Sequence, residues 1–232
     1  MLASYAQLYM RTLANIPPVP SVTPIYKTTV STTTDETTST FNSVDIGTPH
    51  PKRIIILACY HGVAAAATAT VNGIDHYHRT QNTAHEFSMF AHYVPNGTTA
   101  TITVSATSSI RKAVSVYVAY PENPMPLDSG TATANTGTNA NVADMKTQAS
   151  GFLIYSGGQH ATLGTFTTTW NGTEAVTEDI DAQLESAASY TMGRITTITT
   201  SADLNDVNMA QSTSGTKRLV VTTWGPPRRQ AG

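Results

Sequence analysis

Two stretches, "RIIILACYHG" at residues 53–62 and "FLIYSGGQHA" at residues 152–161, correspond when the chain is shifted by 99 residues. The first contains a continuous apolar run over 54–60. A run of this length, bounded by turn-forming residues, is typical of a buried strand. The pair therefore predicts one buried strand in each of two repeated units, and it matches His61 to His160.

Further matches follow in the same order along the chain, which indicates an internal repeat. The shift of 99 residues also places Asn72-Gly73 on Asn171-Gly172, within "TATVNGID" and "TTTWNGTE". The other matched pairs are "SVDIG" (43–47) with "VADMK" (142–146), "AHEFSM" (84–89) with "AASYTM" (187–192), and "KAVSVYVAYP" (112–121) with "KRLVVTTWGP" (217–226).

Each unit has the pattern of six or seven short strands, with turn signals about every ten residues. The chain contains 41 threonines, and this β-branched residue is poor in helices and suited to a pleated surface. We therefore predict an all-β protein made of two tandem antiparallel β-sandwich, jelly-roll-like units. The first unit is expected over 25–124 and the second over 125–232, after an N-terminal arm at 1–24.

The N-terminal segment has the apolar spacing of a short helix over 2–14, with Leu2, Leu8 and Leu13 on one stripe. "PPVPSVTP" follows at 17–24 and must be extended, because each proline removes a donor and disfavours helix before it. A short apolar helix on a proline-stiffened strap predicts an arm that docks on a neighbouring chain. The alternative is a helix folded back over its own unit.

Composition excludes several classes of function. Charged residues make up 12% of the chain and the formal net charge is −2, so no basic face exists to bind nucleic acid. The single cysteine, Cys59, permits neither an intrachain disulfide nor a cysteine zinc site, and is expected to be a small core residue. No stretch has the pattern of a signal peptide or a membrane span. We therefore expect assembly in a cytoplasm, without membrane insertion.

The most conspicuous candidate site is "GIDHYHRTQNTAHEFSMFAH" at 73–92, which holds His76, His78, His85 and His92. A His-x-His pair followed by Glu86 is similar to the first motif of the cupins, a metal-binding jelly-roll family, but the glutamate comes later and the second motif is absent. Alternation along a strand sends His85 and His92 to opposite faces. The second unit has Ala175, Thr177, Ala188 and Ile195 at the matching positions. We therefore expect no metal, with Phe87 and Met89 in the core and His76, His78 and His92 on the surface.

Other candidates have structural interpretations. His61 and His160 are expected to cap a loop, and "TEDID" at 177–181 to be a solvated turn rather than a calcium loop. The sequons at Asn96 and Asn171 are interpreted as Asn-Gly turns. No nucleophile elbow, phosphate-binding loop or dinucleotide fingerprint is present. We therefore predict a non-enzyme with no catalytic, cofactor-binding or metal-binding residues.

The low charge, the tandem sandwiches, the arm and the lack of a catalytic motif together resemble the structural proteins of tailed-bacteriophage virions. The resemblance is to head-decoration, collar, tail and fibre-adaptor subunits, and it implies a virion location with contacts to copies of itself and to other virion proteins. Two alternatives stay open. One is a carbohydrate-binding or adhesin module that binds a host-surface glycan, with Trp170, Trp224 or Tyr77 as a stacking platform. The other is a metal-dependent jelly-roll enzyme built on His76 and His78.

Overall fold

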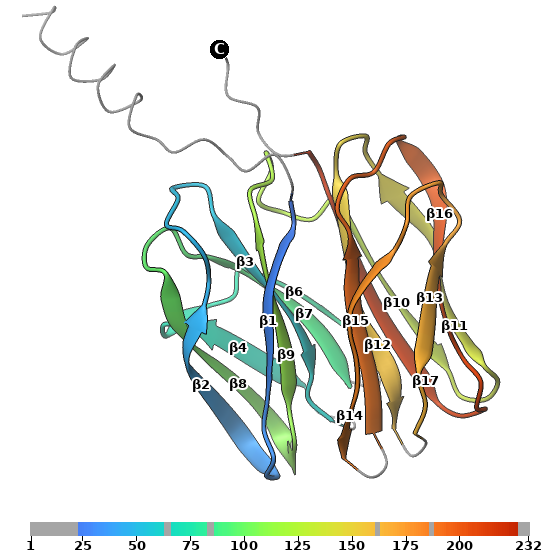
Figure 1. The fold of residues 1–232 in the computed structure, drawn as a ribbon, viewed down its shortest axis with the longest axis horizontal. Helices are drawn as coiled ribbons and strands as arrows, with labels where there is room; N and C mark the ends of the chain where they lie inside the picture. The colour runs from blue at the N-terminus through green and yellow to red at the C-terminus, as the bar shows by residue number, and fades with distance from the viewer. Residues whose placement is uncertain (1–22, 63–65, 83–85, 161–162, 186–187, 227–232) are drawn as a thin grey trace, which may run out of the picture.

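A computed structural model describes residues 23–62, 66–82, 86–160, 163–185 and 188–226, and these residues form strands and loops without a helix (Figure 1). The all-β prediction is confirmed, as is the pair of antiparallel sandwiches. The expected N-terminal helix and most of the arm, residues 1–22, lie outside the described residues, as does His85. Four sheets stack as layers, two to each sandwich.

The first sandwich has the interleaved strand order of a jelly roll. One sheet runs β1-β9-β3-β7-β6 and its partner β2-β8-β4-β5, and all pairings are antiparallel. The strands are β1 (Ile25–Ser31), β2 (Glu36–Asp45), β3 (Ile54–Tyr60), β4 (Ala67–Val71), β5 (Ile74–Asp75), β6 (His78–Gln81), β7 (Phe87–Tyr93), β8 (Thr99–Ile110) and β9 (Ala113–Ala119).

The second sandwich repeats this order, with sheets β10-β17-β12-β15-β14 and β11-β16-β13. Asn72-Gly73 follows β4 and Asn171-Gly172 follows β13, so the two dipeptides occupy equivalent positions as expected, although only Asn72 and Gly73 have left-handed backbone angles. The strands are β10 (Asp128–Ala134), β11 (Asn139–Thr147), β12 (Phe152–His160), β13 (Phe166–Trp170), β14 (Thr177–Glu185), β15 (Ala188–Ile195), β16 (Ala202–Gln211) and β17 (Lys217–Trp224).

The register corrects the alignment of the two buried strands by one residue. Ile54 pairs with Ala119 and Phe152 pairs with Trp224, while the aligned segments 112–121 and 217–226 make Ala119 equivalent to Trp224. Ile54 is therefore equivalent to Phe152, and the match of His61 to His160 is wrong. His61 corresponds instead to Gln159. A one-residue slip exchanges the two faces of a strand, so residue-type similarity in uniformly apolar runs does not fix it.

The two sandwiches are joined by a buried apolar layer that we call the seam. It lies between the β1-β9-β3-β7-β6 sheet and the β10-β17-β12-β15-β14 sheet, which face one another in Figure 1. Strands β3 and β9 have every residue buried because one face fills the first sandwich and the other fills the seam. The seam residues include Ile54, Ile56, Phe87, Met89, Tyr117, Phe152, Ile154, Tyr190, Met192 and Trp224.

Equivalent surfaces of the two units meet in the seam. Tyr60 stacks on Tyr190, with ring centroids 6.2 Å apart. By the corrected register, Gly158 is the equivalent of Tyr60, and Phe87 is the equivalent of Tyr190. A Cβ added at Gly158 would lie 2.7 Å from Phe87 Cζ, so the reciprocal contact also exists. This reciprocity is the signature of a two-fold, isologous interface, here formed within one chain.

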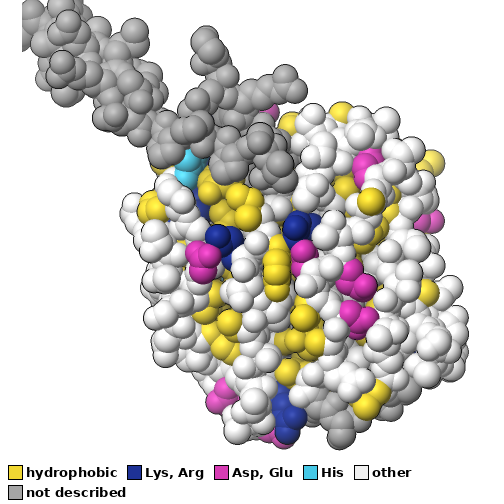
Figure 2. Space-filling view, viewed as in Figure 1, with side chains coloured by type: hydrophobic (Ala, Val, Ile, Leu, Met, Phe, Trp, Pro, Cys, Tyr) yellow, Lys and Arg dark blue, Asp and Glu magenta, His cyan; other side chains and the backbone are white. Residues whose placement is uncertain are grey.

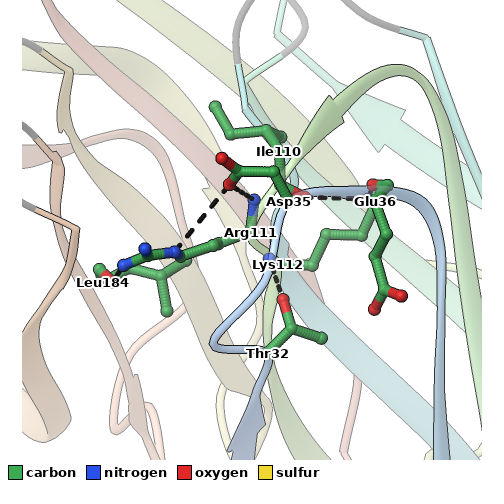
Figure 3. Close-up of polar contacts among 7 residues, drawn as sticks. All are labelled: Thr32, Asp35, Glu36, Ile110, Arg111, Lys112 and Leu184. Carbon is green, nitrogen blue, oxygen red and sulfur yellow. Dashed lines mark hydrogen bonds and ion pairs between the residues drawn. The ribbon is translucent and has the colours of Figure 1, made fainter.

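A buried lysine occupies equivalent positions in the two units. Lys112 donates from Nζ to the carbonyl oxygens of Glu36 and Ile110, and thereby ties the β1–β2 loop to the β8–β9 loop (Figure 3). Lys217 donates to the carbonyls of Gly137, at 2.9 Å, and Thr213, at 2.7 Å, and joins the corresponding loops of the second unit. Burial lowers the pKa of both lysines. Each sandwich is thus closed at this end by one ammonium group.

Two further side chains tie elements together. Arg111 donates from Nη1 to the Leu184 carbonyl of β14, 3.1 Å away across the seam (Figure 3). At the other end of the first sandwich, the buried guanidinium of Arg53 donates only to backbone carbonyls, those of Ile46, Gly47, Thr48, Val94, Asn96 and Gly97. These bonds hold the loops that flank β3 and β7.

The seam makes a prediction at Gly158. Its added Cβ would lie 2.3 Å from the Ser189 carbonyl oxygen of the neighbouring strand β15 and 2.7 Å from Phe87 Cζ across the seam, so Gly158→Val must displace β15 and Phe87. We expect a loss of about 1–3 kcal/mol in the free energy of unfolding. Chemical denaturation measures it, with Thr167→Val on an exposed position of β13 as the control, for which about 0.5 kcal/mol or less is expected. Equal stabilities of the two variants would contradict the tight seam.

Candidate functional site: the histidine segment between β4 and β7

The histidine segment begins as a hairpin on one sheet of the first sandwich and then crosses to the other sheet. β5 extends the β4 edge for two residues after the Asn72-Gly73 turn, and β6 then pairs with β7. Asn72 and Gly73 both have left-handed backbone angles, at φ 53° and 75°. Two successive residues of this kind define the tight hairpin turn that Asn-Gly favours. His76 and His78 therefore lie where the chain crosses between sheets.

His76 and Arg79 cap the free edge of β4. The Asn72 N–H bonds to Thr101 of β8, so the alternate residues Ala67 and Ala69 direct their backbone groups away from β8. β5 ends before it reaches them. Arg79 Nη1 donates to the Ala67 carbonyl at 2.9 Å, and His76 Nδ1 donates to the Ala69 carbonyl at 3.3 Å. The two side chains thus replace the missing strand.

His92 is buried, and the prediction that it lies on the surface is wrong. It is fully enclosed on β7, on the face that carries Phe90 into the core of the first sandwich. Its Nδ1 donates to the Ile74 carbonyl at 3.3 Å, and its ring centroid lies 6.1 Å from that of His76. The equivalent residue in the second sandwich, Ile195, is also a core residue. The repeat therefore places His92 inward.

The His92 ring is held in its neutral form. With Nδ1–H bonded to a carbonyl, Nε2 carries the lone pair, and this buried atom has no hydrogen-bond partner among the described residues. Loss of solvation, with a smaller repulsion from His76, lowers the pKa of His92 to about 4. Burial also lowers the pKa of His78, whose Nε2 lies 2.9 Å from Thr80 Oγ1.

The residues of the cupin-like pattern are not brought together. Within the described ranges, no three histidine, cysteine, aspartate or glutamate side chains gather as metal ligands. Glu86 is buried at the seam, with Oε1 4.0 Å from Arg218 Nε of the second sandwich. His76 and His78 are partly buried and are bonded to Ala69 and Thr80. Phe87 and Met89 pack in the seam, as expected of core residues.

The remaining sequence candidates also have structural surroundings. Cys59 is buried in the core of the first sandwich, and burial raises the pKa of its thiol. His61 is buried, and its Nε2 lies 2.7 Å from Ser88 Oγ. This is a side-chain contact on the adjacent strand β7.

The "TEDID" carboxylates form part of strand β14, so the expectation of a solvated turn is wrong. The strand follows from the alternation of Ile180, Ala182 and Leu184 with polar residues in the sequence. In the structure these three apolar side chains pack against the seam. The carboxylates have separate partners. Asp179 is paired with Arg194, Glu178 accepts from Thr191 at 2.6 Å, and Asp181 accepts from the Phe166 N–H at 2.9 Å. They therefore do not converge on one ligand position.

The aromatic residues named for a glycan platform are dispersed. Trp224 is buried in the seam, where it stacks on Phe152 with centroids 5.9 Å apart. Trp170 packs partly buried against the second core and donates to Glu174 at 3.0 Å. Tyr77 is the one exposed member of the three, and its hydroxyl donates to the Pro124 carbonyl. A platform that uses either tryptophan is therefore not formed.

Comparison with known proteins gives no relative for this arrangement: no protein-family model, curated protein or solved structure matches the chain. In the described part of the chain, no helix has the length and apolar character needed to span a membrane.

The buried His92 makes a prediction about pH. Its pKa is lower in the folded chain than the usual value of 6.5, so its contribution to stability is complete above pH 6.5 and is lost as the pH falls towards 4. Between pH 7.5 and pH 4, the free energy of unfolding of the wild type should fall by about 3 kcal/mol more than that of His92→Ile, as measured by chemical denaturation at both pH values. The His78→Gln variant should lose nearly as much stability over this range as the wild type. A pH profile unchanged by His92→Ile would show that His92 is not held neutral.

Proposed function

We propose that this protein is a structural subunit of a virion, of the kind found in the decoration, collar, tail or fibre-adaptor parts of tailed bacteriophages. It acts by contacts with copies of itself and with other virion proteins, and it carries out no reaction. The observation that carries the proposal is a two-sandwich block whose outer faces consist mainly of uncharged polar side chains, with Asp144, Lys146, Asp203 and Asp206 as charged positions on β11 and β16. The jelly-roll order supports it as an analogy of fold, since viral capsid proteins and lectins both use this architecture.

The outer faces of the two sandwiches share one design. Cross-strand rows on β2, β8 and β4 consist of threonine and serine, and the equivalent rows on β11, β16 and β13 consist of asparagine, threonine and alanine. Figure 2 views the block edge-on, so these outer faces lie at its two sides, and the charged side chains in that view gather mainly across the middle. Short uncharged side chains carry a small desolvation cost, so these faces suit close packing in an assembly. The rows are Thr38–Ser105–Thr68, Thr40–Thr103–Thr70, Asn139–Ala210–Thr167 and Asn141–Asn208–Thr169.

The sheet edges are built against uncontrolled strand pairing. The outer edge strands β2 and β11 each contain two bulges. Ser43 and Asp144, at φ 56° and 58°, occupy equivalent places within them. Bulges twist an edge strand away from a strand of another molecule and so prevent two sheets from joining edge to edge. An assembly of these blocks would therefore use faces and arms rather than open edges.

The titratable groups that are buried serve the scaffold. Lys112, Lys217 and Arg53 donate to backbone carbonyls, while Asp179 is paired with Arg194. Burial raises the pKa of five groups that interact with one another around β14, namely Glu178, Asp179, Asp181, Tyr117 and Tyr155. Asp179 is nevertheless paired with Arg194, Glu178 accepts from Thr191 and Asp181 accepts from the Phe166 N–H. Catalytic sites instead aim a nucleophile or base at open space, so these internal partners support a structural role.

The proposal is tested by removing residues 1–20. We expect the shortened chain to lose assembly, seen by size-exclusion chromatography with light scattering and by electron microscopy, while its circular dichroism keeps the β-sandwich spectrum. The apolar stripe of Leu2, Leu8 and Leu13 is then the assembly element. Full assembly without residues 1–20, or a full-length chain that is monomeric at all concentrations, would contradict the proposal.

A metal analysis separates the structural role from the enzyme alternative. Protein purified without chelator should contain no stoichiometric zinc, iron or manganese, because His76 and His78 are bonded to Ala69 and Thr80. A His76→Ala, His78→Ala variant should show the same metal content as the wild type. Stoichiometric metal that is lost in the variant would favour the metal-dependent enzyme.

A further inference from the structure

An exposed apolar patch lies beside the connection between the two sandwiches. It consists of Ile74, Tyr77 and Tyr93 from the histidine segment and β7, with Met125 and Leu127 from the connection between β9 and β10. Their exposed fractions are 49%, 38%, 50%, 44% and 43%. These five residues, which we call the connector patch, are most of the large apolar side chains that the described surface exposes.

Hydrogen bonds show that the members of the patch are neighbours. The Tyr77 hydroxyl donates to the Pro124 carbonyl at 2.6 Å, and its N–H bonds to Ala91 of β7, two residues before Tyr93. His92, which precedes Tyr93 and points to the opposite face of β7, bonds to the Ile74 carbonyl, and the Tyr93 hydroxyl donates to the Pro51 carbonyl at 2.6 Å. The hydrogen bonds therefore join Tyr77 to the connector and place Ile74 and Tyr93 on either side of the end of β7. Exposed apolar side chains gathered at one end of a block in this way mark an interaction site.

We propose that the connector patch receives the N-terminal arm of a second copy of this chain, residues 2–13. This inference rests on the proposed structural function and names the surface that the arm contacts. The arm supplies an apolar stripe of Leu2, Tyr5, Leu8, Tyr9 and Leu13, which matches an apolar receiving surface without charge pairing.

The arm leaves the block beside the patch of its own chain, and the proline-rich strap is what favours a second copy. β1 begins at Ile25 opposite Val118, and the connector starts directly after β9, so the arm leaves from the same end of the block as the patch. Pro17, Pro18, Pro20 and Pro24 stand between the stripe and β1. Proline-rich segments extend by about 3.1 Å per residue and resist sharp reversal. An extended strap of eight residues, 17–24, would place the stripe about 25 Å from the start of β1, which favours the patch of a second copy.

Contact between an arm and a patch on different copies is heterologous. Such a contact, repeated from copy to copy, closes into a ring or continues as a stack. The assembly would then depend on one donor surface and one acceptor surface in every chain.

Cysteine pairing between two preparations tests the inference. One preparation carries Leu8→Cys and the other Leu127→Cys, and they are mixed and oxidised under native conditions. Cys59 is buried with a raised thiol pKa, so it stays out of the reaction. A disulfide-linked dimer should form only in the mixture of the two. Leu204→Cys, which is 72% exposed on β16, replaces Leu127→Cys in the matched control and should give no dimer.

Assembly measurements separate this inference from the proposed function. Tyr93→Ser with Leu127→Ser should weaken assembly at least about tenfold, as judged from its concentration dependence. If deletion of 1–20 abolishes assembly while the patch variant assembles normally and no cross-link forms, the inference is wrong and the structural function stands. A doubly substituted Leu8→Cys, Leu127→Cys chain that closes only within itself would show that the arm folds back. Assembly that withstands the deletion overturns both.

Discussion

Burial of the seam is the constraint on which the rest of the molecule depends. Strands β3 and β9 are apolar on both faces, so a first sandwich alone would expose Ile54, Ile56 and Tyr117 to water. The second sandwich has the same requirement at Phe152 and Ile154. Burial of such side chains contributes about 1.5–3 kcal/mol each, which makes the paired state the stable one. The two repeats are therefore a covalent version of a two-fold dimer.

A two-fold seam within one chain permits asymmetry that two identical chains could not have. Tyr60 fills the space opposite Tyr190, while Gly158 leaves room for Phe87. A tyrosine at position 158 would collide with Phe87, so a symmetric pair of Tyr60-type residues could not be accommodated at both places. Two different halves in one chain thus permit one large–small exchange across the axis, and the seam packs tightly because of it.

Polar side chains in this protein mainly complete backbone hydrogen bonding. Lys112 and Lys217 close the loops at one end, and Arg53 closes them at the other end of the first sandwich. In the second sandwich Gly151 replaces Arg53, and Ser150 and Gly151 bond directly to Ile198 through their backbones. His76 and Arg79 likewise donate to backbone carbonyls along the free edge of β4. His76 therefore caps a strand edge, whereas His92 is a core residue.

The fold could be predicted from the sequence because threonine content, turn spacing and repeat order all indicate strands. The burial of His92 could also have been inferred, since the apolar residue Ile195 occupies the matching position. The three carboxylates of "TEDID" suggested a turn, although Ile180, Ala182 and Leu184 alternate with polar residues as in a strand. The slip that matched His61 to His160 could not be detected, because apolar runs read alike in either register. The seam and the β4 cap depend on contacts between distant segments, which no local pattern encodes.

The pairing of the first strand with the last in each sandwich has a consequence for synthesis. β1 bonds to β9 and β10 bonds to β17, so neither sandwich can close its sheet until its final strand has left the ribosome. At about 5–20 residues per second, the second half of the chain takes on the order of 5–20 seconds to appear. During that interval the first half presents its seam face to solvent. Two first halves would place Tyr60 against Phe87 at both positions, so the large–small exchange that tightens the seam also disfavours pairing between nascent chains.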